Sequence, residues 1–426
     1  MSNTHRPPTR RTANEPWTAR RGPRVVVTGI GVISAAGTGV EENWKRVVAG
    51  EPTAARDSVL FGSPVDFACR VPDFDPGPRP GGPQAERLDR YAQLAMVAAA
   101  EALASAGLPA SPGDPDRCGI VLGSVAGGMG TLEEQAARLE RGGPTAVAGR
   151  TMPLGLLSSA AGAISVRHGL RGTCLSVATA CASGTQAIGL ARDLVGAGTL
   201  DIALAGGADA PLTPFNAAAY ARLRALSRRA DDPRGASRPF SATRDGFVLG
   251  EGAGFLVLER EDDARARRAP LLAVVAGHAA TADAHHAVRP DPTGSGARRA
   301  MLGALADADL DPGSVGHINA HGTSTLLNDA VEGTAIGEVF GDRVAVSSTK
   351  GVTGHTFGAA GALEAAYAVL ALREGLIPPT ANLTDPDPSI PVDLVAAQAR
   401  RARLDAVMSN SFGFGGYNAS LVLTTV

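Results

Sequence analysis

The sequence contains little lysine and no long apolar segment. Only Lys45 and Lys350 are lysine among 40 basic residues, which face 42 acidic residues and leave a net charge of −2. This balance excludes a strong overall attraction to nucleic acid or to an anionic membrane. Glycine, proline or charge interrupts every hydrophobic stretch before the ~18 residues that a membrane span requires. Because lysine is so rare, Lys350 is a candidate for a position that needs a compact ammonium group.

Cysteine is also scarce. The four cysteines, Cys69, Cys118, Cys174 and Cys181, are irregularly spaced and include no CxxC pair. In a chain of 426 residues without a secretory leader, this usage is typical of reduced thiols and predicts a cytoplasmic location. One cysteine is a candidate nucleophile, and we expect the others to pack as small core residues.

The bulk composition is that of a folded protein. Hydrophobic residues make up 44% and charged residues 19% of the chain, which predicts a sizeable core. Residues 1–23 are instead rich in arginine and proline and predict a disordered tail. Beyond the tail, strands, glycine-rich turns and helices alternate. This alternation predicts an α/β fold with a mostly parallel sheet that helices cover on both faces.

Two segments repeat the same order of elements. Residues 174–195 comprise an expected strand, a turn of small residues that contains Cys181, and an expected helix. Residues 344–373 repeat this order, with a glycine-rich turn between the strand and the helix. We therefore predict two copies of one α/β unit, residues 24–268 and residues 269–426, whose turns meet at the same ends of the sheet.

Cys181 is the candidate nucleophile. It lies in the segment ATACASG (residues 178–184), where small side chains allow a sharp turn and leave the sulfur accessible. At the start of a helix, unpaired amides and the positive end of the helix dipole favour the thiolate, so we expect a pKa below the usual ~8.5. The same amides can stabilise an oxyanion. The alternative is a buried cysteine that packs like alanine.

Two histidines follow expected strands in loops rich in glycine and threonine. His321 begins the segment HGTST, and His355 ends the segment KGVTGH. A single histidine in such a loop is more often structural than catalytic, but two of them beside a cysteine turn of the same type favour a catalytic centre. A metal site is the rival interpretation, although the spacing of the two histidines matches no common ligand pattern.

Two other segments carry motifs of interest. Asp283, His285 and His286 are a weaker candidate for a metal site. Residues 410–418, NSFGFGGYN, combine glycines that allow close backbone approach with Phe414, whose ring can gate a pocket. This segment lacks the Lys-Ser/Thr ending of a phosphate-binding loop, so we do not interpret it as one.

In this order and spacing, the motifs resemble those of the β-ketoacyl-acyl-carrier-protein synthases. The resemblance rests on TACASG around Cys181, HGTST followed by Asp329 and Glu332, KGVTGHTFGAAG and NSFGFGGYN, and it extends from about residue 24 to residue 426. It implies the thiolase fold, in which duplicated βαβ halves form a layered αβαβα architecture. It also implies the condensing activity of fatty-acid and type II polyketide chain elongation.

The resemblance implies a role for each reactive residue. Cys181 would carry the acyl chain as a thioester, and the amides of Cys181 and Phe414 would form the oxyanion hole. His321 and His355 would bind the carbonyl of a malonyl thioester and stabilise the enolate that forms as CO₂ leaves. No resident cofactor and no metal is implied, because the substrates arrive on the phosphopantetheine of an acyl carrier protein.

Supporting roles follow from the same resemblance. Lys350 and Glu332 would hold the two histidine loops, and Lys350 would also tune the charge near His355. Thr323 and Thr325 are suited to hydrogen bonds with the pantetheine arm.

The resemblance also implies a substrate pocket and partner proteins. The pocket would be lined at four positions: Ala126, Tyr220, Phe412 and Phe414. The small side chain of Ala126 favours a roomy pocket. Arg87 and Arg224 are candidates for docking an acidic acyl carrier protein. Members of the family pair sheet edges, so we expect a dimer, either of two copies or with a subunit similar to a chain-length factor.

Other members of the thiolase superfamily fit the sequence less well. A thiolase would need a second cysteine in residues 409–418, which contain none. Initiating and chalcone-type synthases use Cys-His-Asn, whereas this chain has His355 in the place of the Asn, and a non-catalytic chain-length factor would lack Cys181. An acyltransferase or a cysteine hydrolase on the same scaffold stays open. Gly351 and Leu326-Leu327 depart from the usual residues of the family, and they leave the choice between fatty-acid and polyketide pathways open. Between pathways, we favour a specialised polyketide or unusual fatty-acyl pathway.

Overall fold

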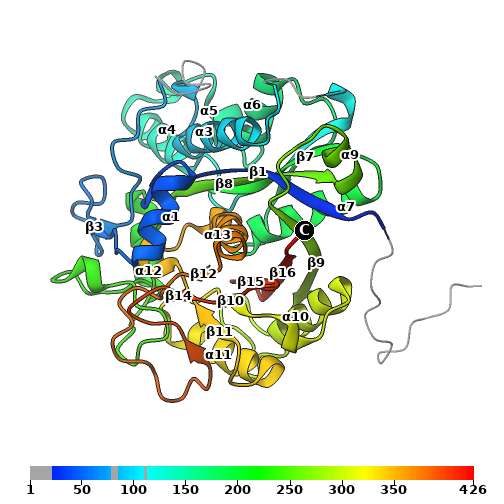
Figure 1. Cartoon of the computed structure of the whole chain (residues 1–426). Helices are drawn as coiled ribbons and strands as arrows, with labels where there is room; N and C mark the ends of the chain where they lie inside the picture. Colours follow the sequence, from blue (N-terminus) through cyan, green and yellow to red (C-terminus); the bar gives the residue numbers. More distant parts are fainter. Residues whose placement is uncertain (1–21, 78–84, 110–112) are drawn as a thin grey trace, which may run out of the picture.

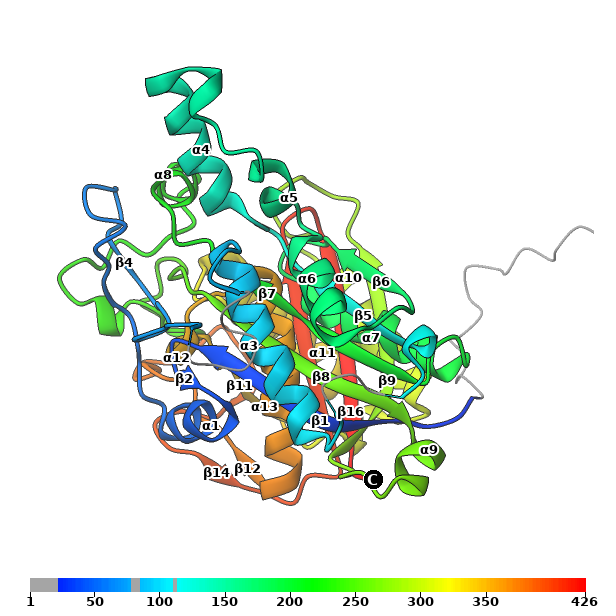
Figure 2. The ribbon, with the colours of Figure 1, turned by 90° about the horizontal axis from the view of Figure 1, so that it is seen from above.

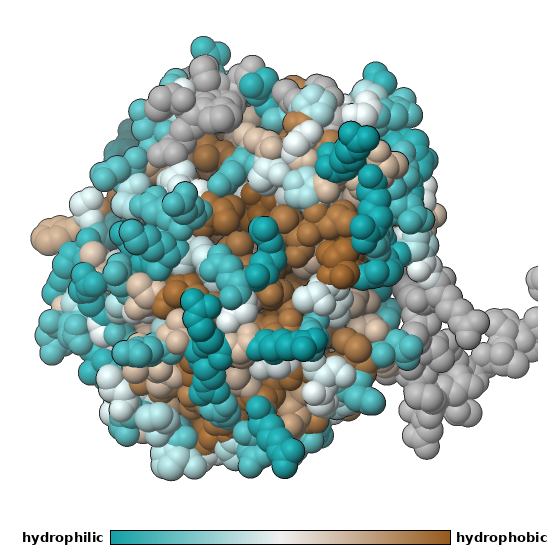
Figure 3. All heavy atoms as spheres, viewed as in Figure 1, coloured by the Kyte–Doolittle hydropathy of each residue, from teal (hydrophilic) through white to brown (hydrophobic). Residues whose placement is uncertain are grey.

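The computed structural model describes residues 22–77, 85–109 and 113–426 (Figure 1). The predicted disordered tail therefore lies outside the described residues, apart from its last two positions. Within the described ranges, none of the helices combines the length and apolarity that crossing a bilayer requires. On the face viewed in Figure 1, hydrophobic residues gather in the middle and hydrophilic side chains are scattered over it and around the rim (Figure 3).

In the described residues, 12 strands form one large sheet, and two further sheets have two strands each. The strands of the large sheet are β1 (Val25–Ser34), β2 (Gly37–Thr38), β5 (Cys118–Gly123), β6 (Cys174–Val177), β7 (Ile202–Asp209), β8 (Gly252–Arg260), β9 (Ala273–Ala282), β10 (His317–Asn319), β11 (Ala345–Ser347), β13 (Asp393–Leu394), β15 (Ala406–Gly413) and β16 (Tyr417–Thr424). The small sheets pair β3 (Ala55–Arg56) with β4 (Phe67–Ala68) and β12 (Leu376–Ile377) with β14 (Arg400–Arg401).

Helices connect most of these strands. They are α1 (Val40–Ala49), α3 (Arg90–Ser105), α4 (Met129–Gly142), α5 (Thr151–Gly155), α6 (Ser159–His168), α7 (Ser183–Gly196), α8 (Pro214–Arg222), α9 (Glu261–Ala266), α10 (Ser295–Ala308), α11 (Leu326–Phe340), α12 (Lys350–Thr353) and α13 (Ala360–Glu374). Short 3₁₀ turns lie at Pro115–Arg117, Pro144–Ala146, Pro233–Gly235, Pro312–Ser314 and Phe357–Ala359.

The large sheet consists of two halves with the same strand arrangement. The first half runs β6-β5-β7-β8-β1 and the second runs β11-β10-β15-β16-β9. The halves join where β1 and β9 pair at two positions, Val26 with Val274 and Val27 with Ala273. This correspondence confirms the predicted duplication: β6 and α7 occupy the same place in the first half as β11 and α13 do in the second. The predicted boundary at residues 268–269 falls in the link between α9 and β9 and stays a prediction.

The sheet is mixed, so the prediction of a mostly parallel sheet is wrong. β5 is parallel to β6 and β7, and β10 is parallel to β11 and β15, but the remaining strands of each half are antiparallel. For one antiparallel pair, β15 and β16, the sequence cue is the tight turn that joins them. Gly415 and Gly416 have φ of 84° and 74° there, and such a turn can join antiparallel strands only.

The elements stack in five layers (Figures 1 and 2). Helices α3 and α6 cover the outer face of the first half-sheet, and α10 and α11 cover that of the second. α7 and α13 pack against each other between the two halves. This arrangement confirms the αβαβα architecture. In Figure 2, α4 and α8 lie at one end of the molecule and the C-terminus lies at the opposite end.

Small residues allow α7 and α13, the helices of the middle layer, to pack closely together. Every residue of α13 from Ala360 to Leu372 is buried, so this helix is surrounded by protein on all sides. On α7, an added Cβ at Gly184 would lie 2.5 Å from the carbonyl oxygen of Gly358 and 2.9 Å from the amide nitrogen of Ala362. The two central helices thus approach closely next to the turns that follow β6 and β11.

Gly184→Ala is expected to destabilise the protein by about 1–3 kcal/mol, because its Cβ would overlap backbone atoms that cannot move independently. Denaturant unfolding measures the difference. Gly196→Ala on the same helix is the matched control, since its nearest neighbour would be the Cγ2 of Val25 at 3.7 Å. We expect it to be neutral or to stabilise by up to about 1 kcal/mol. Equal effects of the two substitutions would contradict the close approach of α7 and α13.

Candidate active site

Cys181 lies at a strained turn between β6 and α7. Ala180 adopts a positive φ of 48°, which alanine rarely takes, and α7 begins two residues after the cysteine. The hydroxyl of Ser183 stabilises this turn: it donates to the carbonyl of Ala180 at 2.6 Å and accepts from the amide of Thr179 at 2.9 Å. The turn therefore holds the Cys181 sulfur at the start of α7, as predicted from the small residues around it.

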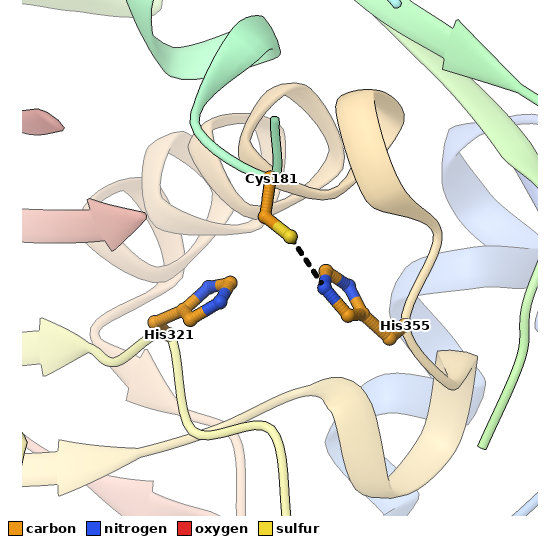
Figure 4. Close-up of side chains that lie close together, drawn as sticks. All are labelled: Cys181, His321 and His355. Carbon is orange, nitrogen blue, oxygen red and sulfur yellow. Dashed lines mark hydrogen bonds between the residues drawn. The ribbon is translucent and has the colours of Figure 1, made fainter. Parts of the chain in front are cut away.

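His355 reaches Cys181 from the other half of the molecule. It follows α12 and Gly354, and its backbone is held by hydrogen bonds with Val248 and Gly250. The Nε2 atom of His355 lies 3.0 Å from the Sγ of Cys181, within hydrogen-bond distance (Figure 4). The imidazole and the thiol thus form the direct contact between the two turns that the internal repeat predicted.

His321 completes the cluster from the loop after β10. The centroids of the His321 and His355 rings are 5.3 Å apart, and the two rings are nearly perpendicular (Figure 4). The carboxylate of Glu332 on α11 accepts hydrogen bonds from the amides of His321 and Gly322, both at 2.7 Å. Glu332 does not contact the ring, so it positions the loop rather than reacting with substrate.

A second buried carboxylate holds the same loop. Asp329 accepts from the amides of Thr323 at 2.9 Å and Ser324 at 3.1 Å. It also accepts from the amide of Phe240 at 2.8 Å, which ties the loop to the preceding half of the chain. The hydroxyls of Thr323 and Thr325 lie 2.9 Å apart beside it.

Burial determines the charge states of the reactive groups. It raises the pKa of the Cys181 thiol to about 11, although the charge of Lys350 and backbone amides act in the opposite direction. The prediction of a lowered pKa is therefore wrong, because desolvation outweighs the start of the helix. Burial, with the charge of Lys350 as the second cause, lowers the pKa of both His321 and His355 well below the usual value. At neutral pH the cluster consists of a thiol and two neutral imidazoles.

Lys350 supplies the positive charge of the site without touching the sulfur. Its buried ammonium forms an ion pair with Glu364 on α13. Burial raises the pKa of Glu364 to about 7, and Lys350 acts to lower it. The hydroxyl of Ser237 donates to the Lys350 carbonyl at 2.6 Å, which fixes α12 in front of His355. The sequence analysis did not identify Glu364, because nothing in a helix pattern indicates which inward-facing position meets a lysine from another element.

Backbone amides near the sulfur come from two segments. The amides of Phe414 and of Cys181 itself both interact with the Cys181 sulfur and lower its pKa. The Phe414 ring lies over Tyr220, with centroids 6.5 Å apart and an interplanar angle of 27°. The predicted pair of oxyanion donors thus lies at the nucleophile.

A pocket of about 580 Å³ opens onto this cluster. Of the residues predicted to form the site, it is lined by Cys181, His321, His355, Thr323, Thr325, Tyr220, Phe412, Phe414 and Arg224. Four others lie outside the lining: Ala126, Arg87, Lys350 and Glu332. The rings of Phe247 and Phe357, which the sequence analysis did not single out, also line it and contact the His355 ring edge to face.

Asp209 is another residue that the sequence analysis missed. It is fully buried and accepts from the amides of Val125 and Ala126, both at 2.9 Å, and from the amide of Gly358 at 2.7 Å. It therefore joins the glycine-rich loop after β5 to the loop after His355. Burial raises its pKa to about 6.

Metal binding was the rival interpretation of the histidines. The donor atoms of Cys181, His321 and His355 lie within 4.8 Å of one another, and this is the one such group among the described residues. Its sulfur and imidazole donors suit zinc, but Cys181 and His355 are already joined by a hydrogen bond. At the weaker candidate, the Asp283 carboxylate instead accepts from Asn418 at 2.7 Å and from the amide of Asp291 at 3.0 Å.

Comparison with known families identifies this arrangement. The model of the β-ketoacyl synthase N-terminal domain matches residues 23–264, and that of the β-ketoacyl synthase C-terminal domain matches residues 272–384. The chain belongs to the β-ketoacyl synthase family. It is an acyltransferase that forms β-ketoacyl products by condensation, as the resemblance implied.

Two relatives of the β-ketoacyl synthase match nearly the whole length of the chain. The 3-oxoacyl-[acyl-carrier-protein] synthase 2 of Coxiella burnetii is 41% identical over 410 residues, which cover 95% of this chain and 99% of that protein. The protein of the same name from Synechocystis is 41% identical over 405 residues, which cover 93% of this chain and 97% of that protein.

Solved structures of ketosynthases share the fold. A β-ketoacyl synthase from Burkholderia phymatum is 36% identical with a TM-score of 0.89, and the match covers 95% of this chain and 100% of that one. The ishigamide ketosynthase/chain length factor is 35% identical with a TM-score of 0.90, over the same shares. The type II polyketide ketosynthase of the AntDE:AntF complex is 32% identical with a TM-score of 0.88, again over 95% of this chain and 100% of that one.

The charge of Lys350 can be tested through the Cys181 thiol. In the double variant Lys350→Met/Glu364→Gln, the pKa of Cys181 should rise further, because the positive charge that favours the thiolate is gone. Removing both partners avoids leaving one buried charge unpaired. The pH dependence of Cys181 alkylation by iodoacetamide, followed by peptide mass spectrometry, reports the midpoint. A midpoint unchanged in the variant, or one near the usual ~8.5 in the wild type, would contradict this account.

Proposed function

We propose that Cys181 carries an acyl chain and that His321 and His355 activate a malonyl unit delivered by an acyl carrier protein. The observation that carries the proposal is the Cys181–His355 hydrogen bond, with His321 beside it, in the lining of a pocket of about 580 Å³. A nucleophile, a base and two ring donors are then within reach of one bound thioester.

In the first step the Cys181 sulfur attacks the thioester carbonyl of the acyl donor. His355 Nε2 takes the thiol proton, which the raised pKa of Cys181 makes necessary. The carbonyl oxygen becomes an oxyanion and accepts from the amides of Cys181 and Phe414. The carbon–sulfur bond to the carrier breaks, and the departing thiolate recovers the proton through His355.

In the second step the malonyl thioester binds with its carbonyl oxygen between His321 and His355. Each neutral ring carries one N–H, so this step uses the tautomers whose proton faces that oxygen; for His355 this is the Nε2–H tautomer, whereas acyl transfer uses the tautomer in which Nε2 accepts. The carboxylate leaves as CO₂, and its electron pair forms an enolate whose negative oxygen binds the two donors more strongly than the ground-state carbonyl does. The enolate carbon attacks the acyl thioester, the Cys181 thiolate leaves, and it takes up from solvent water the one proton that the step consumes.

The substrates bring their own phosphopantetheine arm, so the mechanism requires no resident cofactor. Thr323 and Thr325 line the same pocket as the two histidines, and their hydroxyls suit the amides of that arm. We keep a cytoplasmic location as a prediction, which rests on four cysteines that are all free thiols.

Partner proteins are proposed by analogy with the solved relatives. One is an acyl-carrier protein in complex with its ketosynthase, and others pair a ketosynthase with a chain length factor. In this chain, β6 ends the large sheet and exposes Cys174, Leu175 and Ser176. Val166 on the adjacent α6 is 86% exposed. An edge strand beside exposed apolar residues fits pairing with a second copy or with a subunit similar to a chain-length factor.

The division of labour between the histidines is testable. His321→Ala should retain acyl transfer to Cys181 but lower condensation by about 10²–10³-fold, because it removes one donor to the enolate. His355→Ala should slow both steps, since His355 also takes the thiol proton. Intact mass spectrometry follows the acyl adduct, and product analysis with malonyl carrier protein follows condensation. Acyl transfer followed by release to water, without decarboxylation of malonyl carrier protein, would support a hydrolase or a plain acyltransferase instead.

The two docking candidates should behave differently. Arg224 is exposed and lines the pocket, whereas Arg87 is exposed but is not among the lining residues. Arg224→Ala should raise the KM for a carrier-bound acyl group about ten-fold, the effect of losing one charge-assisted hydrogen bond. It should leave the KM for an N-acetylcysteamine thioester unchanged. Arg87→Ala is the matched control. An equal rise in the KM for the carrier-bound acyl group in both variants would contradict the different behaviour expected of the two arginines.

A further inference from the structure

Tyr220 stands out among the four tyrosines of the chain because of its hydroxyl. The Tyr91 hydroxyl donates to the carbonyl of Leu156 at 2.7 Å, and the Tyr367 hydroxyl donates to the Asn43 side chain at 3.1 Å. Tyr417 is 43% exposed. Among the described residues, nothing forms a hydrogen bond with the hydroxyl of Tyr220.

The surroundings of Tyr220 are apolar and aromatic. Its ring centroid lies 5.1 Å from that of Phe357, 5.8 Å from that of Phe247 and 6.5 Å from that of Phe414. Tyr220 is partly buried and lines the same pocket as Cys181. The hydroxyl is therefore an isolated polar group in an aromatic wall close to the nucleophile.

The hydroxyl acts as a donor at neutral pH. Burial raises the pKa of Tyr220 to about 12, and the charges of Cys181 and Asp209 act in the same direction. A phenol that faces a pocket in this state can bond to water or to an accepting oxygen on whatever occupies the pocket. A purely hydrocarbon chain would displace the water and leave the donor unpaired, which is costly.

We propose that the Tyr220 hydroxyl selects acyl chains that carry an accepting oxygen, such as β-keto or β-hydroxy acyl groups, over saturated chains of the same length. This inference rests on the proposed function, because it takes the acyl chain to be bound to Cys181 within this pocket. A site with a fixed polar group discriminates against a ligand that lacks the matching group more strongly than an apolar pocket discriminates between similar chains. Tyr220 thus sets substrate preference without taking part in bond making.

The test compares rates of acylation for matched N-acetylcysteamine thioesters: octanoyl, 3-hydroxyoctanoyl, 3-oxooctanoyl and 5-oxooctanoyl. Intact mass spectrometry of the full chain gives the rate of the Cys181 adduct for each. At least one oxygenated chain should react about five- to ten-fold faster than octanoyl in the wild type. In Tyr220→Phe that ratio should fall to about one, chiefly because the oxygenated chain slows.

Tyr367→Phe is the matched control, because it removes a tyrosine hydroxyl whose partner is Asn43 on α1. It should lower stability and leave the ratio unchanged, whereas Tyr220→Phe should leave the melting temperature unchanged. The inference is overturned if no oxygenated chain is preferred or if the preference survives in Tyr220→Phe. In both cases acylation itself would still support the proposed function. Failure of every thioester to acylate Cys181 would instead overturn the proposed function, and the inference with it.

Discussion

The hydrogen bond between the Cys181 thiol and His355 Nε2 joins residues that are 174 positions apart, one in each half of the molecule. It exists because β6 and β11 occupy equivalent places in the two half-sheets, so the turns that follow them reach the same point from opposite sides. α7 and α13 begin near these turns and pack together between the halves. The pocket, the His321 loop and the Lys350–Glu364 pair are all arranged around this one contact.

Burial keeps the reactive groups uncharged, and this neutrality suits a condensing centre. A low-polarity environment raises the pKa of the Cys181 thiol and lowers those of His321 and His355. Negative charge then develops only while bonds form and break. Hydrogen-bond donors that are fixed in this low-polarity environment stabilise that charge more than they would in water. Lys350, whose positive charge favours the Cys181 thiolate, forms an ion pair with Glu364, so the buried ammonium group is not left unpaired.

Buried carboxylates determine the shape of the loops and not their chemistry. Glu332 and Asp329 bind the backbone amides of the His321 loop, and Asp209 binds amides on both sides of the pocket. Each satisfies several N–H groups in irregular segments that have no strand or helix to pair with. These bonds allow irregular, glycine-rich segments to hold the histidine rings in fixed positions.

Much of this could be predicted from the sequence, and the limits are specific. Turn residues and strand periodicity are local signals, and they singled out Cys181, His321 and His355 as candidate reactive residues in similar turns. The family and the layered fold followed from the resemblance of these motifs, in their order and spacing, to those of the β-ketoacyl synthases. Only the tertiary structure decided the strand directions, the ionisation of Cys181 and the pairing of Lys350 with Glu364. Only the tertiary structure also showed that Ala126 is not among the residues that line the pocket, and that the Tyr220 hydroxyl has no hydrogen-bond partner among the described residues. Each of these depends on desolvation and on contacts between distant segments, which no local pattern records.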